Sequence, residues 1–552
     1  MQRGFLFLLL LLQGLLLGYL SWFTSPNRTE AGHVGAMVYF WHTGQFDVFH
    51  VNPPLSRFVA GIPIKLFCSP NYDWKSYSPR PQDRCEWQLG SAFIIANSVA
   101  DLRLYIFLAR LALIPLILLG SYFGYRIASE LYGQRSGVLF LTLWIFSPLV
   151  LGWGATICPD VVAASLGIIG LYTFRLYLRT PSWRNTFLAG FCLGLLPLVK
   201  LTWIIAYPVW LIVWLVWQKQ RNIRTWNILK MCIIMIISLY VINTGYIFDG
   251  AFRLLKDYKF LSGTLTGHDV SKTGAMKPGN RFADSILGYL PVPLPGEFVQ
   301  GIDTQRRDFE KGIESYMNGT WSEHGWKHYY AYVLLLKEPL GVLLLAVITA
   351  GVTLFYRKNY PVREELLLLL PALLIFSFIS FQDGFSLHPR YILLVLPFLY
   401  LWISKTARYT TRKEPVLLVL TIGCTFWVII SSMSFYPYSM SYFNELAGKP
   451  TDYPKYLLGS NISWGQEAYD VKRWIDKHPD ATPLYISVGS SIPLNKMGVT
   501  EEKAVPTDPA TGWMLIDVNS LYEKGDKYAW LKKHQPAEMI GYSIWVYHIE
   551  KE

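Results

Sequence analysis

Charged side chains are scarce in this chain of 552 residues. Asp, Glu, Lys and Arg make up 16% of it, whereas a typical soluble domain carries about a quarter. That shortage excludes an ordinary soluble protein. Hydrophobic residues account for 52% and aromatic residues for 16%, and they gather in runs whose lengths suit membrane-spanning helices. The sequence therefore predicts a mainly α-helical, polytopic membrane protein.

Cysteines are also few, and the chain has no visible internal repeat. The 6 cysteines show no metal-ligand spacing. Cys68 and Cys85 fall in one expected loop, and a disulfide between them is compatible with an extracytoplasmic position. The sequence leaves that pairing open.

The formal charge of +12 does not require a nucleic-acid partner. Cytoplasmic loops of membrane proteins collect Lys and Arg, and this bias alone produces a basic balance. We expect membrane lipids around the chain and no nucleic acid.

The apolar runs predict about eleven transmembrane helices. They are Phe5–Ser21, Leu104–Arg126, Ser136–Trp153, Val161–Tyr177, Thr186–Val199, Leu201–Trp217, Ile228–Ile247, Tyr329–Phe355, Leu366–Phe381, Tyr391–Ser404 and Pro415–Met433.

The stretch from residue 186 to residue 217 decides the topology. It is too long for one span, and Lys200 follows Pro197 in its middle. We interpret it as a tight hairpin with Lys200 at the outer turn, because two spans there leave the later basic loops on the inside. We expect an inner-membrane protein with a cytoplasmic N-terminus.

With the loops assigned to the two sides in this way, the chain divides into two parts. A membrane domain covers residues 1–434, with outer loops at about 23–100 and 248–328. Residues 435–552 alternate short helices and strands, which predicts a small α/β extracytoplasmic domain. Its expected elements are Tyr469–Lys477, Pro483–Val488, Met514–Val518, Tyr528–Lys533 and Ser543–Ile549.

Polar residues at the expected outer boundary are the candidates for chemistry. Glu30 lies one loop from the first span, where a helix-start or solvated acid is the plainer interpretation. Asp160 follows Cys158-Pro159 in a nearly apolar hairpin. A carboxylate there needs a partner, a metal or a reactant, unless it caps the following helix.

Basic residues occupy the same expected side. A lysine at a membrane turn, such as Lys200, costs free energy unless its side chain snorkels to the interface or binds a negative group. Lys337 precedes Glu338, with which it could form an ion pair, and Arg390 follows His388-Pro389 as a phosphate clamp or a topology anchor.

These groups together suggest a reaction class. Carboxylates serve as general bases toward a hydroxyl, and cations stabilise a leaving phosphate. A lipid-linked phosphate donor would hold its headgroup at this depth. The predicted reaction is glycosyl transfer from a polyprenyl-phosphate sugar to a protein, lipid or glycan acceptor.

At this point the sequence resembles a known family, the GT-C membrane glycosyltransferases of family 39. That family includes the protein O-mannosyltransferases and the aminoarabinose transferases. The motifs that carry the resemblance follow the family's order. They are Glu30-Ala31-Gly32-His33, Asn52-Pro53-Pro54-Leu55, Pro159-Asp160, Gly190 to Lys200-Leu201-Thr202, Arg390-Tyr391, and the Tyr442–Glu445 and Asn461–Gln466 segments typical of bacterial members with an outer C-terminal extension.

The resemblance implies the GT-C fold and an inverting transfer. Glu30 would be the catalytic base and Asp160 the second acid. Whether these two bind a divalent metal stays open. The implied substrate-binding residues are His33, Asn52, Pro53, Pro54, Arg57, Lys200, Lys337, His388 and Arg390.

One position departs from the family pattern. Thr29 stands where the family usually has Asp before Glu. This departure keeps a scaffold with inactive membrane machinery as one alternative. A transporter or flippase of lipid-linked saccharides is another, although transporters usually show internal repeats and mid-bilayer charges.

Overall fold

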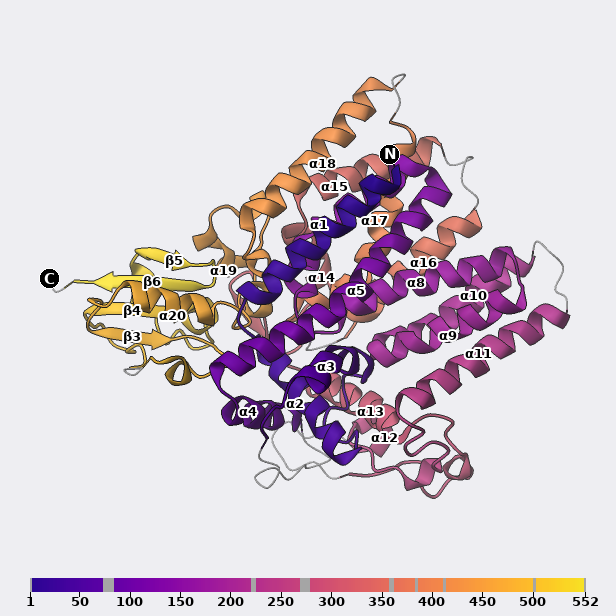
Figure 1. Ribbon diagram of the computed structural model, residues 1–552, viewed down its shortest axis with the longest axis horizontal. Helices are drawn as coiled ribbons and strands as arrows, with labels where there is room; N and C mark the ends of the chain where they lie inside the picture. Colours follow the sequence, from indigo (N-terminus) through magenta and orange to yellow (C-terminus); the bar gives the residue numbers. More distant parts are fainter. Residues whose placement is uncertain are drawn as a thin grey trace.

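The computed structural model describes residues 2–72, 84–219, 225–268, 278–356, 362–382, 386–410, 414–499 and 503–550. Long helices form a bundle, and a small sheet lies at one end of it beside the C-terminus (Figure 1). We call this the domain end of the bundle and the opposite one the far end. The mainly helical fold class predicted from the sequence is confirmed.

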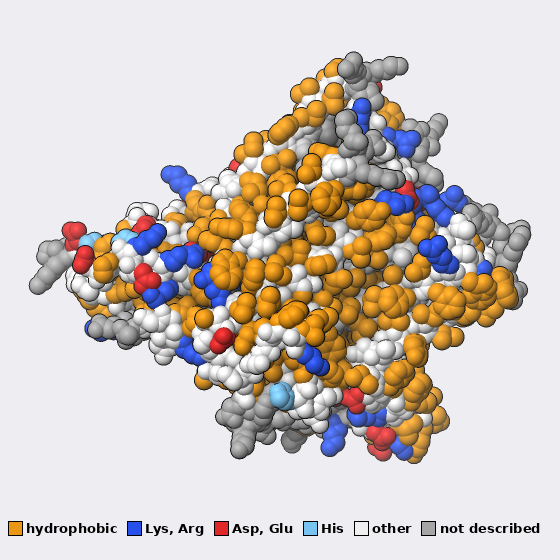
Figure 2. All heavy atoms as spheres, viewed as in Figure 1, with side chains coloured by type: hydrophobic (Ala, Val, Ile, Leu, Met, Phe, Trp, Pro, Cys, Tyr) orange, Lys and Arg blue, Asp and Glu red, His pale blue; other side chains and the backbone are white. Residues whose placement is uncertain are grey.

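Six helices within the described residues are long and apolar enough to cross a membrane. They are α1 (Gln2–Phe23), α5 (Val99–Tyr132), α8 (Asp160–Arg179), α10 (Ala206–Lys219) with the preceding turn Leu201–Ile205, α11 (Thr225–Gly245) and α18 (Pro415–Phe435). Hydrophobic side chains cover the visible face of these helices (Figure 2). The chain is a multi-pass membrane protein.

Two further apolar stretches are broken by bends. Helices α6 (Gln134–Ile145) and α7 (Pro148–Gly154) meet at 57°, and α14 (Tyr329–Lys337) and α15 (Leu340–Phe355) meet at 112°. Proline begins or directly precedes the second helix of each pair, where its missing N–H ends the first helix. The expected spans Ser136–Trp153 and Tyr329–Phe355 each contain one of these bends, and whether each pair crosses the membrane as one span stays a prediction.

The other expected spans are helical but short or charged. They are α9 (Trp183–Val199), α16 (Val362–Ser380) and α17 (Leu396–Ser404), which follows a 3-10 turn at Pro389–Leu394. With each bent pair counted as one span, the described chain has up to eight membrane-crossing helices. The figure of about eleven stays a prediction.

Lys200 interrupts the helical conformation between α9 and the 3-10 turn at Leu201–Ile205. Its backbone is extended, with φ −155° and ψ 127°. Its side chain contacts Asp160 at the start of α8, so both lie at one end of the bundle. Basic residues expected on the inside gather at the far end. There Arg175 contacts Glu130 and Glu364, and Lys405 contacts Glu365.

The first expected outer loop is largely helical, contrary to the sequence interpretation. It contains α2 (Arg28–Thr43), α3 (Leu55–Phe67) and α4 (Glu86–Ala96). Asn27 and Glu30 form a capping box that starts α2, a signal readable in the sequence as Asn-x-x-Glu. Glycines on α2 and α4 let the two backbones approach each other closely.

The second expected outer loop, residues 248–328, also contains a helix that the sequence interpretation missed. Within it lie α12 (Gly263–Thr266), α13 (Gly296–Lys311) and a hairpin of β1 (Ser315–Met317) and β2 (Thr320–Ser322). Helix α13 is amphipathic. It buries Phe298 and Gly301 against the first helices of the chain.

The C-terminal region forms a four-stranded sheet in the order β3-β4-β6-β5, with β3 parallel to β4 and the other pairs antiparallel. Its strands are β3 (Leu484–Ser487), β4 (Gly512–Asp517), β5 (Glu538–Ile540) and β6 (Ile544–Ile549). The accompanying helices are α19 (Tyr453–Tyr456), α20 (Ala468–Lys477) and α21 (Val518–Leu521).

Three strands were expected there, and β5 was not. The expected helix at 528–533 is only a 3-10 turn at Leu531–Lys533. Leu515 and Val546 pack with Val471 and Trp474 of α20, whereas Met514 and Ile516 join the apolar core of the helical bundle. The domain boundary near residue 435 stays a prediction.

Cys68 and Cys85, whose pairing the sequence left open, are both free thiols. The Cys85 thiol is buried and points to the carbonyl of Val48.

We expect Gly90→Ala to destabilise the packing of α4 on α2. An added Cβ at Gly90 would lie 2.7 Å from backbone atoms of Ala31 and Gly32, and such overpacking typically costs about 1–3 kcal/mol. Thermal unfolding in detergent checks this. The matched control is Gly423→Ala on α18, where nothing lies within 4 Å of the added Cβ. Equal unfolding temperatures for the two variants would contradict the close packing.

Candidate functional site

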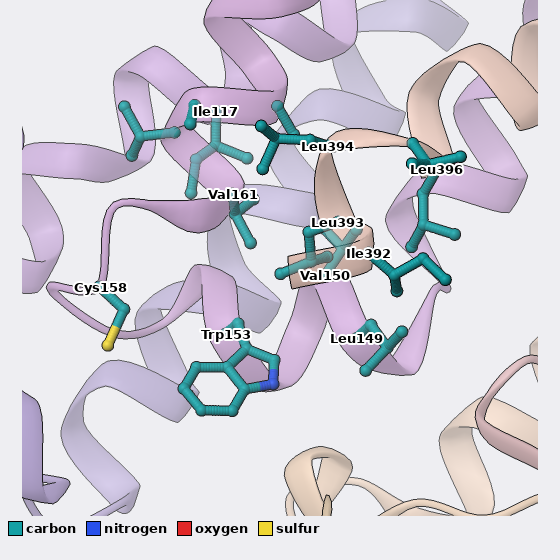
Figure 3. Close-up of a cluster of buried hydrophobic side chains, with 14 of the residues drawn as sticks. Ile117, Leu149, Val150, Trp153, Cys158, Val161, Ile392, Leu393, Leu394 and Leu396 are labelled. Carbon is teal, nitrogen blue, oxygen red and sulfur yellow. The ribbon is translucent and has the colours of Figure 1, made fainter. Parts of the chain in front are cut away.

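Asp160 is held at the domain end by the packing around the α7–α8 connection. Trp153 of α7 and Val161 of α8 are buried, and they lie near Ile392 and Leu393 of the 3-10 turn at 389–394 (Figure 3). Cys158 lies in the loop between the two helices. This apolar packing fixes the loop, and Asp160 follows it as the first residue of α8.

Two cations converge on the Asp160 carboxylate, which is 2% exposed. Lys200 Nζ contacts Oδ1, and Arg390 Nε lies 3.8 Å from Oδ2. The N-cap of α8 is Pro159 and not Asp160, so the cap interpretation does not account for the Asp160 carboxylate. One negative and two positive side chains leave an excess of one positive charge in a buried place, which favours an anionic ligand.

Arg390 and Lys200 are held by aromatic rings as well. The Arg390 guanidinium lies over the Trp153 ring at 5.2 Å and donates to the Cys158 sulfur at 3.5 Å. Lys200 Nζ lies 4.8 Å from the centroid of the Tyr391 ring. Such contacts orient both cations without neutralising them.

Glu30 is satisfied by protein donors. Its carboxylate accepts from Arg110 Nε at 2.8 Å and Nη2 at 2.6 Å, from the Ile157 N–H at 2.9 Å and from the Asn27 N–H at 2.9 Å. Both Glu30 and Arg110 are buried. These donors engage both oxygens of the Glu30 carboxylate.

Glu30 therefore has the contacts of a positioning residue. Its hydrogen bond to the Ile157 N–H fixes the loop three residues before Asp160. Three residues of chain span at most about 11 Å, so Glu30 acts close to Asp160. The role of Glu30 as the base stays a prediction. Sequence reasoning missed Arg110, although an arginine inside a long apolar helix was a signal for a buried partner.

Thr29, the residue that departs from the family pattern, also contacts this loop. Its hydroxyl lies 2.9 Å from the Cys158 sulfur and donates to Asn27 Oδ1 at 2.7 Å. Thr29 thus joins the start of α2 to the loop that leads into Asp160.

His33 and Arg57 flank the ring of Phe49. The His33 and Phe49 rings lie 4.7 Å apart, and the Arg57 guanidinium lies 5.5 Å from the Phe49 centroid. Burial, with the positive charges of Arg57 and Arg390, lowers the pKa of His33 to about 3. His33 is therefore neutral at physiological pH, and its buried Nδ1 has no hydrogen-bond partner among the described residues.

The Asn-Pro-Pro segment shapes the turn into α3. Pro54 is the residue before that helix, Pro53 is buried, and the Asn52 carbonyl accepts from Arg57 Nη1 at 2.6 Å. The turn thus places the Asn52 carbonyl where it holds Arg57.

Two other predicted residues lie toward the C-terminal region. His388 Nδ1 is 2.8 Å from the Ser460 hydroxyl, and the Trp464 ring lies 4.8 Å from the His388 ring. Lys337 does not pair with Glu338. It donates instead to the carbonyls of Met440 and Asn461, which ties α14 to the segment before the sheet.

Metal ligation has no support in the arrangement of side chains. Within the described residues, no three His, Cys, Asp or Glu side chains group as a metal site. Glu30 and Asp160 each face cationic side chains, so their oxygens do not form a shared donor set.

Comparison with known proteins gives one family match. Residues 92–246 match the family described as dolichyl-phosphate-mannose-protein mannosyltransferase. This segment runs from α4 to the end of α11 and includes Arg110, Asp160 and Lys200. No curated protein matches the sequence.

Solved structures show likeness at low identity. ArnT from Cupriavidus metallidurans bound to undecaprenyl phosphate matches with a TM-score of 0.48 and 12% identity, over 98% of this chain and 97% of that chain. The Archaeoglobus fulgidus oligosaccharyltransferase in its apo form matches with a TM-score of 0.45 and 12% identity, over 96% and 72% of the two chains.

We expect Glu30→Gln to unfold more easily than the unmodified protein. It leaves the buried Arg110 charge without its counter-ion, a change that typically costs about 3–5 kcal/mol. The double variant Glu30→Gln, Arg110→Met removes both charges and should recover most of that stability. Thermal unfolding in detergent measures both. A Glu30→Gln variant as stable as the parent would contradict a structural role for the pair.

Proposed function

Residues 92–246 of this membrane protein match the mannosyltransferase family, and we propose that the protein is a membrane glycosyltransferase. It transfers a sugar from a polyprenyl-phosphate donor to an acceptor hydroxyl, with inversion at the anomeric carbon. The reaction takes place at the domain end, which faces the outside of the cell. The acceptor is a hydroxyl of a protein, lipid or glycan.

The convergence of Lys200 and Arg390 on buried Asp160 carries this proposal. A donor phosphodiester carries one negative charge, which equals the positive excess of the three side chains. Its phosphate would replace the Asp160 carboxylate as the partner of the two cations. Guanidinium and ammonium groups are the donors that proteins use for phosphate.

This exchange of partners gives Asp160 its role in the reaction. Once the cations bind phosphate, the carboxylate is free to take the proton of the acceptor hydroxyl. The acceptor oxygen attacks C1 of the sugar, and the bond from C1 to the phosphate oxygen breaks. We assign Asp160 as the base and Glu30, through Ile157, as its positioning residue.

The same cations stabilise the leaving group. Polyprenyl phosphate departs as a monoester and carries one more negative charge than the diester. Asp160 is then protonated and neutral, so Lys200 and Arg390 face the phosphate alone. Cations aimed at the atom where charge develops lower the barrier more than they tighten ground-state binding.

The function can be tested with purified protein in nanodiscs. A panel of radiolabelled polyprenyl-phosphate hexoses and pentoses is supplied with membrane extracts as the acceptor source. We expect release of polyprenyl phosphate and label in the acceptor fraction for one donor. In a parallel reconstitution in vesicles, movement of an intact donor from one leaflet to the other, with no release of polyprenyl phosphate, would support a flippase instead.

We expect Asp160→Asn to lower transfer about 10²–10⁴-fold, the usual contribution of a general base, without weakening polyprenyl-phosphate binding. Lys200→Met should weaken that binding, because it removes a phosphate partner. Transfer assays and a binding titration in nanodiscs separate the two effects. The control is Asp257→Asn, an exposed acid of the 248–328 segment. Full transfer by Asp160→Asn would reject Asp160 as the base.

A further inference from the structure

The chain that follows α11 forms a compact lobe, residues 247–268 and 278–292. Two of its segments run side by side, with the Phe252 N–H bonded to the Val292 carbonyl at 2.9 Å and the Leu255 N–H to the Leu290 carbonyl at 3.0 Å. This ladder joins the first and last parts of the lobe, so the lobe has a defined surface.

That surface is apolar to a degree unusual outside a membrane. Large hydrophobic side chains from both ends of the lobe are exposed, led by Ile286 at 91%. The others are Ile247, Phe248, Phe252, Leu287, Tyr289 and Leu290. A contiguous exposed apolar group of this kind marks a contact with a partner or a lipid surface.

The backbone holds three of these side chains in an uncommon conformation. Ile247, Phe248 and Phe252 have φ of 53°, 58° and 61°. Bulky and β-branched residues rarely adopt the left-handed region, and each costs of order 1–3 kcal/mol there. A hydrophobic environment for their side chains would offset that cost.

Basic side chains accompany the apolar ones. Lys256 Nζ lies 4.0 Å from the centroid of the Tyr289 ring, and the Arg281 guanidinium lies over the ring of Phe282. Arg253 and Lys259 are exposed nearby. Aromatic rings with Lys and Arg beside them are typical of the zone between hydrocarbon and headgroups, where long basic side chains reach toward the phosphates.

The lobe also continues a surface that already faces lipid. Helix α11 is apolar along its length, and its last residue, Gly245, lies two positions before the lobe begins. The lobe extends beside the end of α11 and away from the C-terminal sheet (Figure 1). Hydrophobic side chains are visible both on the helical face and on the lobe, where acidic and basic side chains also lie (Figure 2).

From these observations we propose that the lobe inserts its apolar side chains into the lipid leaflet at the domain end. Ile286, Leu287 and Tyr289 enter the boundary of the hydrocarbon, and the adjacent Lys and Arg side chains contact phosphate headgroups. The occupant of this surface is the bilayer, because the surface is continuous with the membrane-facing side of α11.

This insertion would anchor helix α13, which contacts the segment before α3. Asp303 of α13 accepts from the N–H groups of Leu261 and Ser262 in the lobe. The next contact is with the segment before α3, where Glu297 Oε2 lies 2.7 Å from His50 Nδ1. A lobe fixed in lipid therefore fixes α13 against the segment that leads to Arg57.

Photo-crosslinking tests the insertion without any need for the transfer reaction. Ile286 is replaced by p-benzoylphenylalanine in full-length protein, which is reconstituted in nanodiscs of phosphatidylethanolamine and phosphatidylglycerol. Ile236, exposed on α11, is the lipid-facing control, and Lys477, exposed at the end of α20, is the control expected to face water. Intact mass spectrometry after irradiation detects lipid adducts.

We expect position 286 to give lipid adducts at a yield near that of position 236 and at least about five times that of position 477. A yield equal to that of position 477 would overturn the proposal. Crosslinks from position 286 to a second copy of the chain, in place of lipid, would also overturn it and assign the surface to a dimer. Neither outcome depends on whether the sugar-transfer assay succeeds.

Discussion

A buried ion pair between Glu30 and Arg110 connects the parts of this protein on which the candidate site depends. Arg110 lies within the long helix α5 and donates to the carbonyls of Ser21, Thr24 and Ser25 as well as to Glu30. One guanidinium thereby joins the end of α1, the start of α2 and the middle of α5. In a low-dielectric interior such a charge is tolerable only with this full set of partners.

The pair also fixes the loop that leads into Asp160. Glu30 accepts the Ile157 N–H, and Asp160 begins the next helix. Two carboxylates thus have opposite environments within one short stretch of space. Glu30 is held by a complete set of donors, whereas Asp160 faces the two cations Lys200 and Arg390. Environment, and not residue type, separates the two acids.

The sequence predicted the features that follow from the free-energy cost of placing a charged side chain in an apolar run. Lys200 in an apolar run indicated an outer turn with either snorkelling or a negative partner, and Asp160 in a nearly apolar hairpin indicated a partner, a metal or a reactant unless it capped the following helix. The structure joins these two residues. The sequence did not predict the partner of Glu30, because Arg110 is 80 positions away and sits in a run that otherwise indicates a lipid-facing helix. It also did not predict α2 and α4, whose glycine contacts depend on tertiary packing.

The two faces of the C-terminal sheet have different neighbours, and this difference bears on how the protein can be divided. One face is closed by α20. The other presents Met514, Ile516 and Trp545 to the core of the helical bundle. A fragment cut free at residue 435 would expose that second face to water and would tend to self-associate. The bundle thus completes the hydrophobic core of the sheet, so the two are not independent folding units.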